Sequence, residues 1–219
     1  MAIILCIETA TTNCSVALSV NGSVIALKED NSAQYSHAER LHAYIEEVLA
    51  LSEIDKSQLD AIAVSKGPGS YTGLRIGVSA AKGLCYALDK PLVSILTLES
   101  LSYQLTEMEG CHVAMLDARR MEVYAAVFSS EGKEIRNTKA EVLTSESFLE
   151  FLEQGVVYFI GNGVDKFEKI CNHKNANFVK DKLPSSREMG RLAELKYKKN
   201  EIEDVAYFEP YYLKDFISG

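Results

Sequence analysis

The sequence lacks a surplus of positive charge. It contains 23 lysines and arginines against 31 aspartates and glutamates, so its net charge is −8 with histidine neutral. Proteins that hold nucleic acid directly use clustered basic residues to neutralise phosphates. The local basic cluster at 196–199 is followed at once by three acidic residues at 201–204, which is typical of a solvated helix end. We therefore expect no nucleic-acid-gripping surface on this chain.

Paired cysteines and long apolar runs are also missing. The five cysteines are odd in number and widely spaced, and they form no C-x-x-C pair, which favours buried free thiols in a reducing cytoplasm. The apolar stretch within residues 1–8 has no basic flank and is too short for a signal peptide or a membrane span. Both absences indicate a cytoplasmic protein without membrane contact.

The sequence has none of the common phosphate-loop or helical metal motifs. The glycine-rich stretch at 67–77 does not fit G-x-x-x-x-G-K-[ST], because Leu-Arg follows Gly73 in place of the lysine and the hydroxyl. His37 and His42 are five residues apart, about 140° around a helix, so they are not the i, i+4 pair that binds a metal. Asp117 lies in a charged turn, where pairing to a neighbouring arginine is favoured over general acid–base catalysis. We expect no metal, no cofactor and no catalytic residue.

The same order of elements is predicted twice along the chain. In each half, hydrophobic periodicity and turn residues predict three strands, a helix, a strand and a glycine turn. Glu8 and Asp117 end the first strand of each half, and Ser36 with Glu39 forms a capping box at the first helix. The predicted strands are at 3–8, 15–20, 23–28, 59–64, 112–117, 122–128, 133–136 and 156–160, and the later helices at 74–88, 145–153 and 188–199.

A duplicated unit of this kind predicts an α/β protein with two similar lobes around a cleft. Each lobe is expected to hold a mixed β-sheet with flanking helices. The polar stretch at 107–110 precedes a predicted strand and indicates the boundary. We therefore predict an N-terminal lobe at 1–108 and a C-terminal lobe at 109–219.

Two turns are candidates for ligand binding. The glycine-rich stretch at 65–77 joins a predicted buried strand to a helix, where backbone amides can approach a phosphate closely. The turn after the first strand is rich in hydroxyls, which also suit phosphate. The candidate residues are Thr9, Thr11, Thr12, Gly67 and Gly69. A purely structural turn is the favoured interpretation of the hydroxyl-rich segment and an equal alternative for the glycine-rich one.

The helix at 74–88 carries two apolar stripes, of which one should cover the sheet. The second stripe consists mostly of small residues and permits close approach of another helix. The helix after Ser36 also has a wide apolar band, so two neighbouring helices form a candidate partner surface. Full burial within the monomer is the alternative explanation of both stripes. The candidate interface residues are Leu41, Ile45, Val48, Gly77, Ala80, Ala81 and Leu84.

Several segments together resemble one protein family over the whole chain. The turn after the first strand resembles the D-x-G-T-T of the actin-like superfamily, with Glu8 in place of aspartate and Ala10 in place of glycine. The further segments are similar to those of the TsaB family, also called YeaZ, which are bacterial tRNA threonylcarbamoyladenosine biosynthesis proteins. They are I-E-T-A-T at 7–11, S-K-G-P-G-S-Y-T-G-L-R-I-G at 65–77, A-A-K-G-L at 80–84, L-D-A-R-R-M-E-V-Y at 116–124, G-N-G at 161–163 and P-Y-Y-L at 210–213.

The resemblance implies an actin-like fold, also called the ASKHA fold, with two lobes. It implies a role in making N6-threonylcarbamoyladenosine (t6A) at position 37 of tRNAs that read ANN codons, as a non-catalytic subunit of the TsaD transferase. TsaD carries two metal-binding histidines where this chain has Thr97 and Leu101, neither of which can replace an imidazole.

The resemblance also implies partners. These are TsaD, bound through the helices of the N-terminal lobe, the ATPase TsaE within a larger complex, and a second copy of the chain when TsaD is absent, with tRNA reached only indirectly. Two alternatives stay open. One is an actin-like enzyme, either a small-molecule kinase or a metallopeptidase-like protein, and the other is a binding module regulated by a nucleotide.

Overall fold

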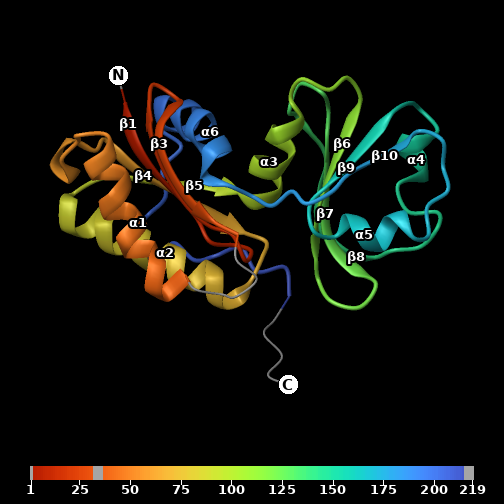
Figure 1. Cartoon of the computed structure of the whole chain (residues 1–219), viewed down its shortest axis with the longest axis horizontal. Helices are drawn as coiled ribbons and strands as arrows, with labels where there is room; N and C mark the ends of the chain where they lie inside the picture. Colours follow the sequence, from red (N-terminus) through yellow and green to blue (C-terminus); the bar gives the residue numbers. More distant parts are fainter. Residues whose placement is uncertain (1, 32–36, 215–219) are drawn as a thin grey trace. The chain divides into compact units, whose positions relative to one another are not determined.

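The computed structural model describes residues 2–31 and 37–214 of the chain (Figure 1). The chain divides into two compact units, the first made of residues 1–100 and 184–219 and the second of residues 101–183. Each unit contains one five-stranded mixed sheet with helices packed against it.

The sheet of the first unit has the strand order β3-β2-β1-β4-β5. β1 runs antiparallel to β2 and parallel to β4, so that Ile4 lies opposite both Ser19 and Ala61. β2 and β3 form a hairpin, and β4 runs parallel to β5. The strands are β1 (Ile3–Glu8), β2 (Cys14–Val20), β3 (Ser23–Asp30), β4 (Ala61–Gly67) and β5 (Leu92–Leu96).

Long helices cover both faces of this sheet (Figure 1). α1 (His37–Leu51) and α2 (Tyr71–Leu88) pack on the face to which Leu5 and Ile7 contribute, and these two side chains are fully buried. α6 (Ser186–Lys198) lies on the opposite face, where the Ser15 and Ser186 hydroxyls are 2.6 Å apart. Burying a large apolar side chain contributes about 1.5–3 kcal/mol to stability. The apolar side chains enclosed between the sheet and these helices therefore stabilise the unit.

The second unit has the strand order β10-β9-β6-β7-β8, which repeats the topology of the first. Phenylalanines fill its core, because Phe148, Phe159 and Phe167 pack edge to face or tilted with ring centroids 4.9–5.5 Å apart. The elements are β6 (Cys111–Asp117), β7 (Glu122–Phe128), β8 (Glu134–Val142), α4 (Leu149–Leu152), β9 (Val157–Ile160), α5 (Val164–Glu168) and β10 (Ala176–Val179).

The predicted repeat of one α/β unit is confirmed by the two identical sheet topologies. β1 and β7 occupy the predicted ranges, whereas α2 begins three residues earlier than predicted. Its start is set by Ser70, whose hydroxyl accepts a hydrogen bond from the Gly73 N–H at 3.2 Å. The predicted capping residue of α1, Ser36, lies outside the described residues.

Some elements were not predicted, and one was too long. The short strands β5 and β10 and the short helices α3 (Thr97–Ser102) and α5 had no strong periodicity. The predicted helix at 145–153 shortens to the four residues of α4, because β8 extends to Val142 and Phe148 adopts a left-handed backbone conformation directly before α4. Short elements of this kind depend on tertiary packing more than on local pattern.

The two units also differ from the predicted lobes of 1–108 and 109–219. The segment at 184–219 belongs to the first unit, because α6 packs on β1, β2 and β5. The first boundary lies between Ser100 and Leu101 instead of near residue 108. No signal in the sequence indicated that the end of the chain returns to the first sheet.

The cysteines carry free thiols, and four of the five are buried. Burial raises the pKa of the Cys6 and Cys85 thiols to about 12, so both are neutral packing residues at physiological pH. None of the described helices is both long enough and apolar enough to cross a membrane.

Candidate functional site

The glycine-rich turn between β4 and α2 packs against the turn that follows β1. The Ser70 N–H donates to the Ala10 carbonyl at 2.7 Å, and the Thr9 hydroxyl donates to the Gly73 carbonyl at 2.8 Å. A Cβ at Gly69 would collide with Ala10, and a Cβ at Gly73 would collide with the Thr9 carbonyl. The glycines therefore serve the close approach of two backbone segments of this chain.

Gly67 meets another part of the chain. Its φ of +114° is disfavoured for other residues, and a Cβ there would lie 2.7 Å from the Tyr211 carbonyl. The Tyr211 N–H also donates to the Lys66 carbonyl at 2.7 Å. Of the candidate ligand residues, the structure brings Gly69 next to the Thr9–Ala10 turn and places Gly67 beneath the C-terminal segment.

The candidate hydroxyls after β1 are mostly turned inward. Thr9 is fully buried, Thr11 nearly so, and Thr12 half-buried. The Thr11 hydroxyl accepts from the Asn13 N–H at 3.3 Å, and its carbonyl lies 2.7 Å from the His37 Nε2. Binding of a nucleotide by these threonines therefore stays a prediction, and their contacts within the chain already explain the sequence of the turn.

Glu8 is a buried carboxyl at the end of β1. Its Oε1 accepts a hydrogen bond from the Ala10 N–H at 2.6 Å, and its side chain has no exposed surface. Burial raises the pKa of Glu8 from its ordinary value of 4.5 to about 7, and the negative charge of Glu188 on α6 adds to the rise. The sequence identified the substitution of glutamate for aspartate here but not the burial.

No metal centre is formed by the residues that the structure describes, among which no three His, Cys, Asp or Glu side chains cluster. Thr97, at the start of α3, is fully buried with its hydroxyl 2.6 Å from that of Ser65. Leu101 is also fully buried. The two residues that the family resemblance sets against the TsaD histidines are thus a hydrogen-bonding residue and a packing residue.

Most of the candidate interface residues on α1 and α2 lie in the core. Leu41, Ile45 and Val48 are at most 5% exposed and pack toward the first sheet. On α2, Ala81 is fully buried and Gly77 lies against Thr9, where a Cβ would collide with the threonine hydroxyl. These positions form the stripe that covers the sheet, which is the alternative that the sequence left open.

The outer face of α1 and α2 carries a groove instead. Its volume is about 720 Å³, and among the predicted interface residues it includes Ala80 and Leu84, which are half-buried. Sequence reasoning missed its polar and aromatic members, although their spacing along α2 is helical and out of phase with the core stripe. The remaining lining residues are Ala38, His42, Tyr71, Thr72, Arg75, Ile76, Ser79 and Gly83.

One rim of the groove is an aromatic–cationic cluster. The Arg75 guanidinium carbon lies 4.2 Å from the centre of the Tyr71 ring, and the Tyr212 ring centroid is 5.1 Å from that of Tyr71. The Arg75 Nε donates to the Tyr212 hydroxyl at 3.3 Å. Arg75 is exposed, so the stacking and the hydrogen bond give a surface cation a defined position.

Comparisons with known proteins cover nearly the whole chain. The family model described as "TsaD: tRNA N6-adenosine threonylcarbamoyltransferase" matches residues 30–216. The "tRNA threonylcarbamoyladenosine biosynthesis protein TsaB" of Haemophilus influenzae is 30% identical over 98% of this chain and 94% of its own length. The protein of the same name from Escherichia coli is 29% identical over 98% of this chain and 96% of its own length.

Solved structures give the same assignment. "YeaZ from Pseudomonas aeruginosa" superposes with a TM-score of 0.84 and 26% identity, covering 97% of this chain and all of that one. A second Pseudomonas aeruginosa structure, described as similar to peptidase YEAZ, has a TM-score of 0.85 and 26% identity over 98% of this chain and all of its own. The two mixed sheets with flanking helices are those of an actin-like α/β fold. The chain belongs to the TsaB family, also called YeaZ, within the wider family that the TsaD model describes.

Proposed function

We propose that this chain is a non-catalytic subunit in the synthesis of t6A at position 37 of ANN-decoding tRNAs. It docks the TsaD transferase through the outer face of α1 and α2 and supports assembly with the ATPase TsaE in the cytoplasm. The same face joins two copies of the chain when TsaD is absent, and tRNA is reached only through the partners. The names of the TsaB relatives support the pathway, and the match to the TsaD family model supports a TsaD-type partner.

The contrast between two surfaces of the first unit carries the proposal. The glycine-rich turn, which is the best sequence candidate for chemistry, is packed against Thr9 and Ala10 of the same chain. The outer face of α1 and α2, by contrast, holds an open groove of about 720 Å³ whose lining includes small and apolar residues. Small residues permit close approach of a partner helix.

The size of this face suits a protein partner. α1 has 15 residues and α2 has 18. At a rise of 1.5 Å per residue the two helices are roughly 22 and 27 Å long. Two helices of this length can bury roughly 800 Å² on each partner, which is the area of a standard stable interface.

Reconstitution of tRNA modification tests the role. Purified TsaD, TsaE, an ANN-decoding tRNA and the threonylcarbamoyl donor are combined with and without this chain, and t6A is measured by mass spectrometry of nucleosides. We expect t6A only when the chain is present, and none when the chain replaces TsaD. Modification by the isolated chain would make it the transferase, and full modification without the chain would refute the subunit role.

Docking is tested separately by light scattering of mixtures with TsaD. We expect a stable complex, and a homodimer when the chain is alone. Substitutions at buried positions such as Ile45 and Ala81 would disturb the core, so they do not report on docking. Exposed groove positions such as Ser79 are the informative ones.

A further inference from the structure

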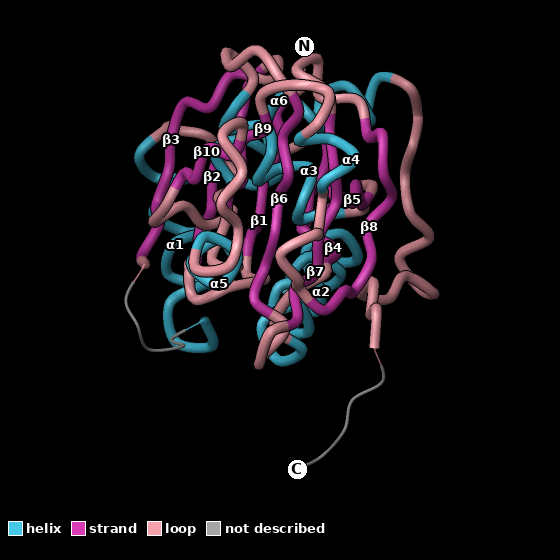
Figure 2. Tube along the Cα trace, turned by 90° about the vertical axis from the view of Figure 1, so that its right-hand side faces the viewer, coloured by secondary structure: helices cyan, strands magenta, loops and turns pink. Residues whose placement is uncertain are grey.

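The last described part of the chain, residues 201–214, is called the C-terminal strap here. Apart from one isolated bridge, it contains no strand and no helix (Figure 2), yet backbone and side-chain bonds hold it along its length. The Glu203 N–H donates to the Leu92 carbonyl of β5 at 2.8 Å, and Lys82 on α2 donates to the carbonyls of Ala206 and Phe208 at 3.2 and 3.0 Å. Phe208 is buried in the core of the first unit.

The strap ends at the docking groove. After the Tyr211 N–H bonds to the Lys66 carbonyl, the next residue, Tyr212, contacts both Tyr71 and Arg75. These two residues line the groove. The strap therefore connects the edge of the first sheet to the groove rim, where Tyr212 contacts the one arginine of the groove lining.

Arg75 is held but not neutralised. Its Nε donates to the Tyr212 hydroxyl and its guanidinium covers the Tyr71 ring, so the donors on its two terminal nitrogens are left for another acceptor. It makes no ion pair within 4.0 Å with a carboxylate of the described residues, although Glu209 is near enough to act on it electrostatically. A guanidinium in a fixed orientation is suited to bidentate binding of a carboxylate.

We propose that Tyr212 positions Arg75 at the groove rim to bind a carboxylate of the docked partner. The inference rests on the proposed docking of TsaD and adds the chemistry by which the groove recognises it. The partner segment is a helix whose small or apolar residues enter the groove over Ile76 and Ala80, with an aspartate or glutamate that reaches Arg75. Tyr212 is a positioning residue, because it acts through Arg75.

Charge complementarity and preorganisation are the physical reasons. An arginine that is already ordered loses less side-chain freedom on binding, so more of the interaction with a carboxylate appears as affinity. Arginine and tyrosine are also enriched among the residues that dominate binding energies. Arg75, Tyr71 and Tyr212 form a cluster of these residue types here.

A double-mutant cycle with TsaD tests the inference. The dissociation constant of the full-length chain and TsaD is measured by calorimetry for wild type, Arg75→Ala, Tyr212→Phe and the double variant. We expect Arg75→Ala to weaken binding about 10-fold or more and Tyr212→Phe about 3-fold, with no added loss in the double variant. The proposal would be overturned if Tyr212→Phe weakened binding equally in wild type and in the Arg75→Ala background. It would also be overturned if Arg75→Ala did not weaken binding.

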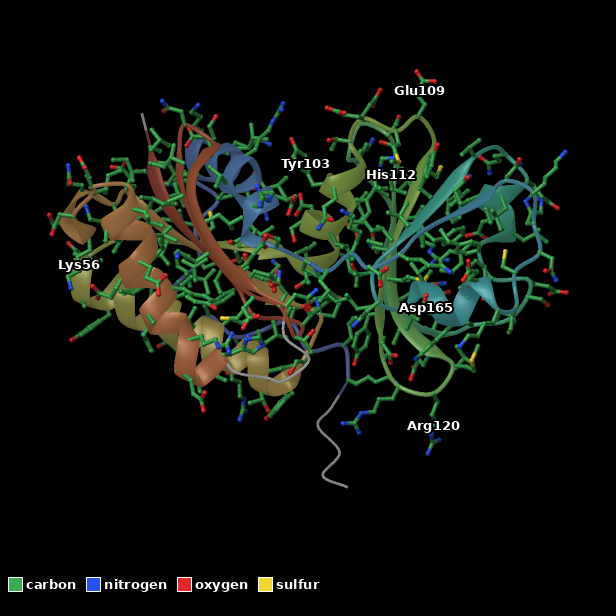
Figure 3. The ribbon with its side chains drawn as sticks, viewed as in Figure 1. Lys56, Tyr103, Glu109, His112, Arg120 and Asp165 are labelled. Carbon is green, nitrogen blue, oxygen red and sulfur yellow. The ribbon has the colours of Figure 1, made fainter. Side chains whose placement is uncertain are left out.

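Salt dependence supplies a readout that a structural role would not change. Wild-type affinity should fall more steeply between low and moderate salt than that of Arg75→Ala, because the variant lacks one charge pair. Arg120→Ala is the matched control, since Arg120 is an exposed arginine of the second unit that points away from the ribbon (Figure 3). Its affinity should equal that of wild type, and unchanged thermal midpoints show that all variants fold.

The outcomes also separate this inference from the proposed function. A wild-type chain that binds TsaD and supports t6A formation while Arg75→Ala binds equally well refutes only the role of Arg75. A wild-type chain that fails to bind TsaD refutes both. Arg75→Lys keeps the charge but not the planar fork, so we expect it to recover less than half of the lost affinity on a logarithmic scale.

Discussion

The two units have the same sheet order but differ in what surrounds it. In the first unit, helices of 15 and 18 residues cover one face of the sheet and carry an open groove on their outer side. In the second unit, the corresponding helices α4 and α5 have four and five residues. One scaffold thus supports a long two-helix surface in one copy and little more than a cover for the core in the other.

The acidic residues at matching strand ends differ in the same way. Glu8 ends β1 fully buried, with its pKa raised to about 7, whereas Asp117 ends β6 exposed and 2.8 Å from the Lys166 ammonium. In the first unit the acid is enclosed because glycines bring the α2 turn onto Thr9 and Ala10. Equal positions in a duplicated fold therefore do not imply equal chemistry.

The largest effect on stability is expected where the two turns of the first unit approach each other closely. Gly73→Ala places a methyl group against the Thr9 carbonyl, and we expect a loss of about 3–4 kcal/mol in the free energy of unfolding. Gly83→Ala is the control on the same helix, because nothing lies within 4 Å of its Cβ position, and it should be neutral or stabilising by up to about 1 kcal/mol. Urea denaturation measures both, and similar effects for the two would refute the packing role of Gly73.

The second prediction concerns the groove on α1 and α2 of the first unit. Ser79→Arg introduces a long cation into the groove, and we expect the dissociation constant for TsaD to rise about 100-fold, or about 2.7 kcal/mol. Ser145→Arg makes the same change at an exposed position of the second unit and should leave binding unchanged. Equal losses would show that docking does not depend on the first unit alone.

Part of the fold and of the candidate site could be predicted from the sequence, and part could not. The alternation of β7 and the helical stripe of α2 predicted their elements, because local pattern and tertiary environment agree there. The sequence could not separate the residues of α1 that face the core from residues that face a partner, because Leu41, Ile45 and Val48 are apolar in either case. The contact of Tyr212 with Arg75 joins residues 137 apart, and no local signal predicts it.

The third prediction is a pH dependence that Glu8 contributes in the first unit. The Glu8 pKa is about 7 when folded and near 4.5 when unfolded, so the folded state holds this proton more tightly. This proton therefore adds to the free energy of unfolding below pH 4.5. Its contribution is lost as the pH rises to 7 and stays lost above that pH. Glutamine does not titrate, so Glu8→Gln should not lose stability over this range. The difference in free energy of unfolding between Glu8→Gln and wild type should therefore shift by about 2 kcal/mol in favour of the variant between pH 5 and pH 8. Parallel curves for both proteins would refute the raised pKa.

The smallest effect is expected at the matching acid of the second unit. Asp117→Asn removes an exposed carboxylate from Lys166, and exposed ion pairs contribute about 0.2–1 kcal/mol. We expect a loss below about 1 kcal/mol that shrinks further in 0.5 M salt, because solvent ions already screen the pair. The turn itself should persist, since the asparagine oxygen can still accept from the Arg119 N–H as Asp117 does. A loss comparable to that of Gly73→Ala would mean that both strand ends are equally enclosed in solution, and the contrast between the units would then fail at the position where they correspond most closely.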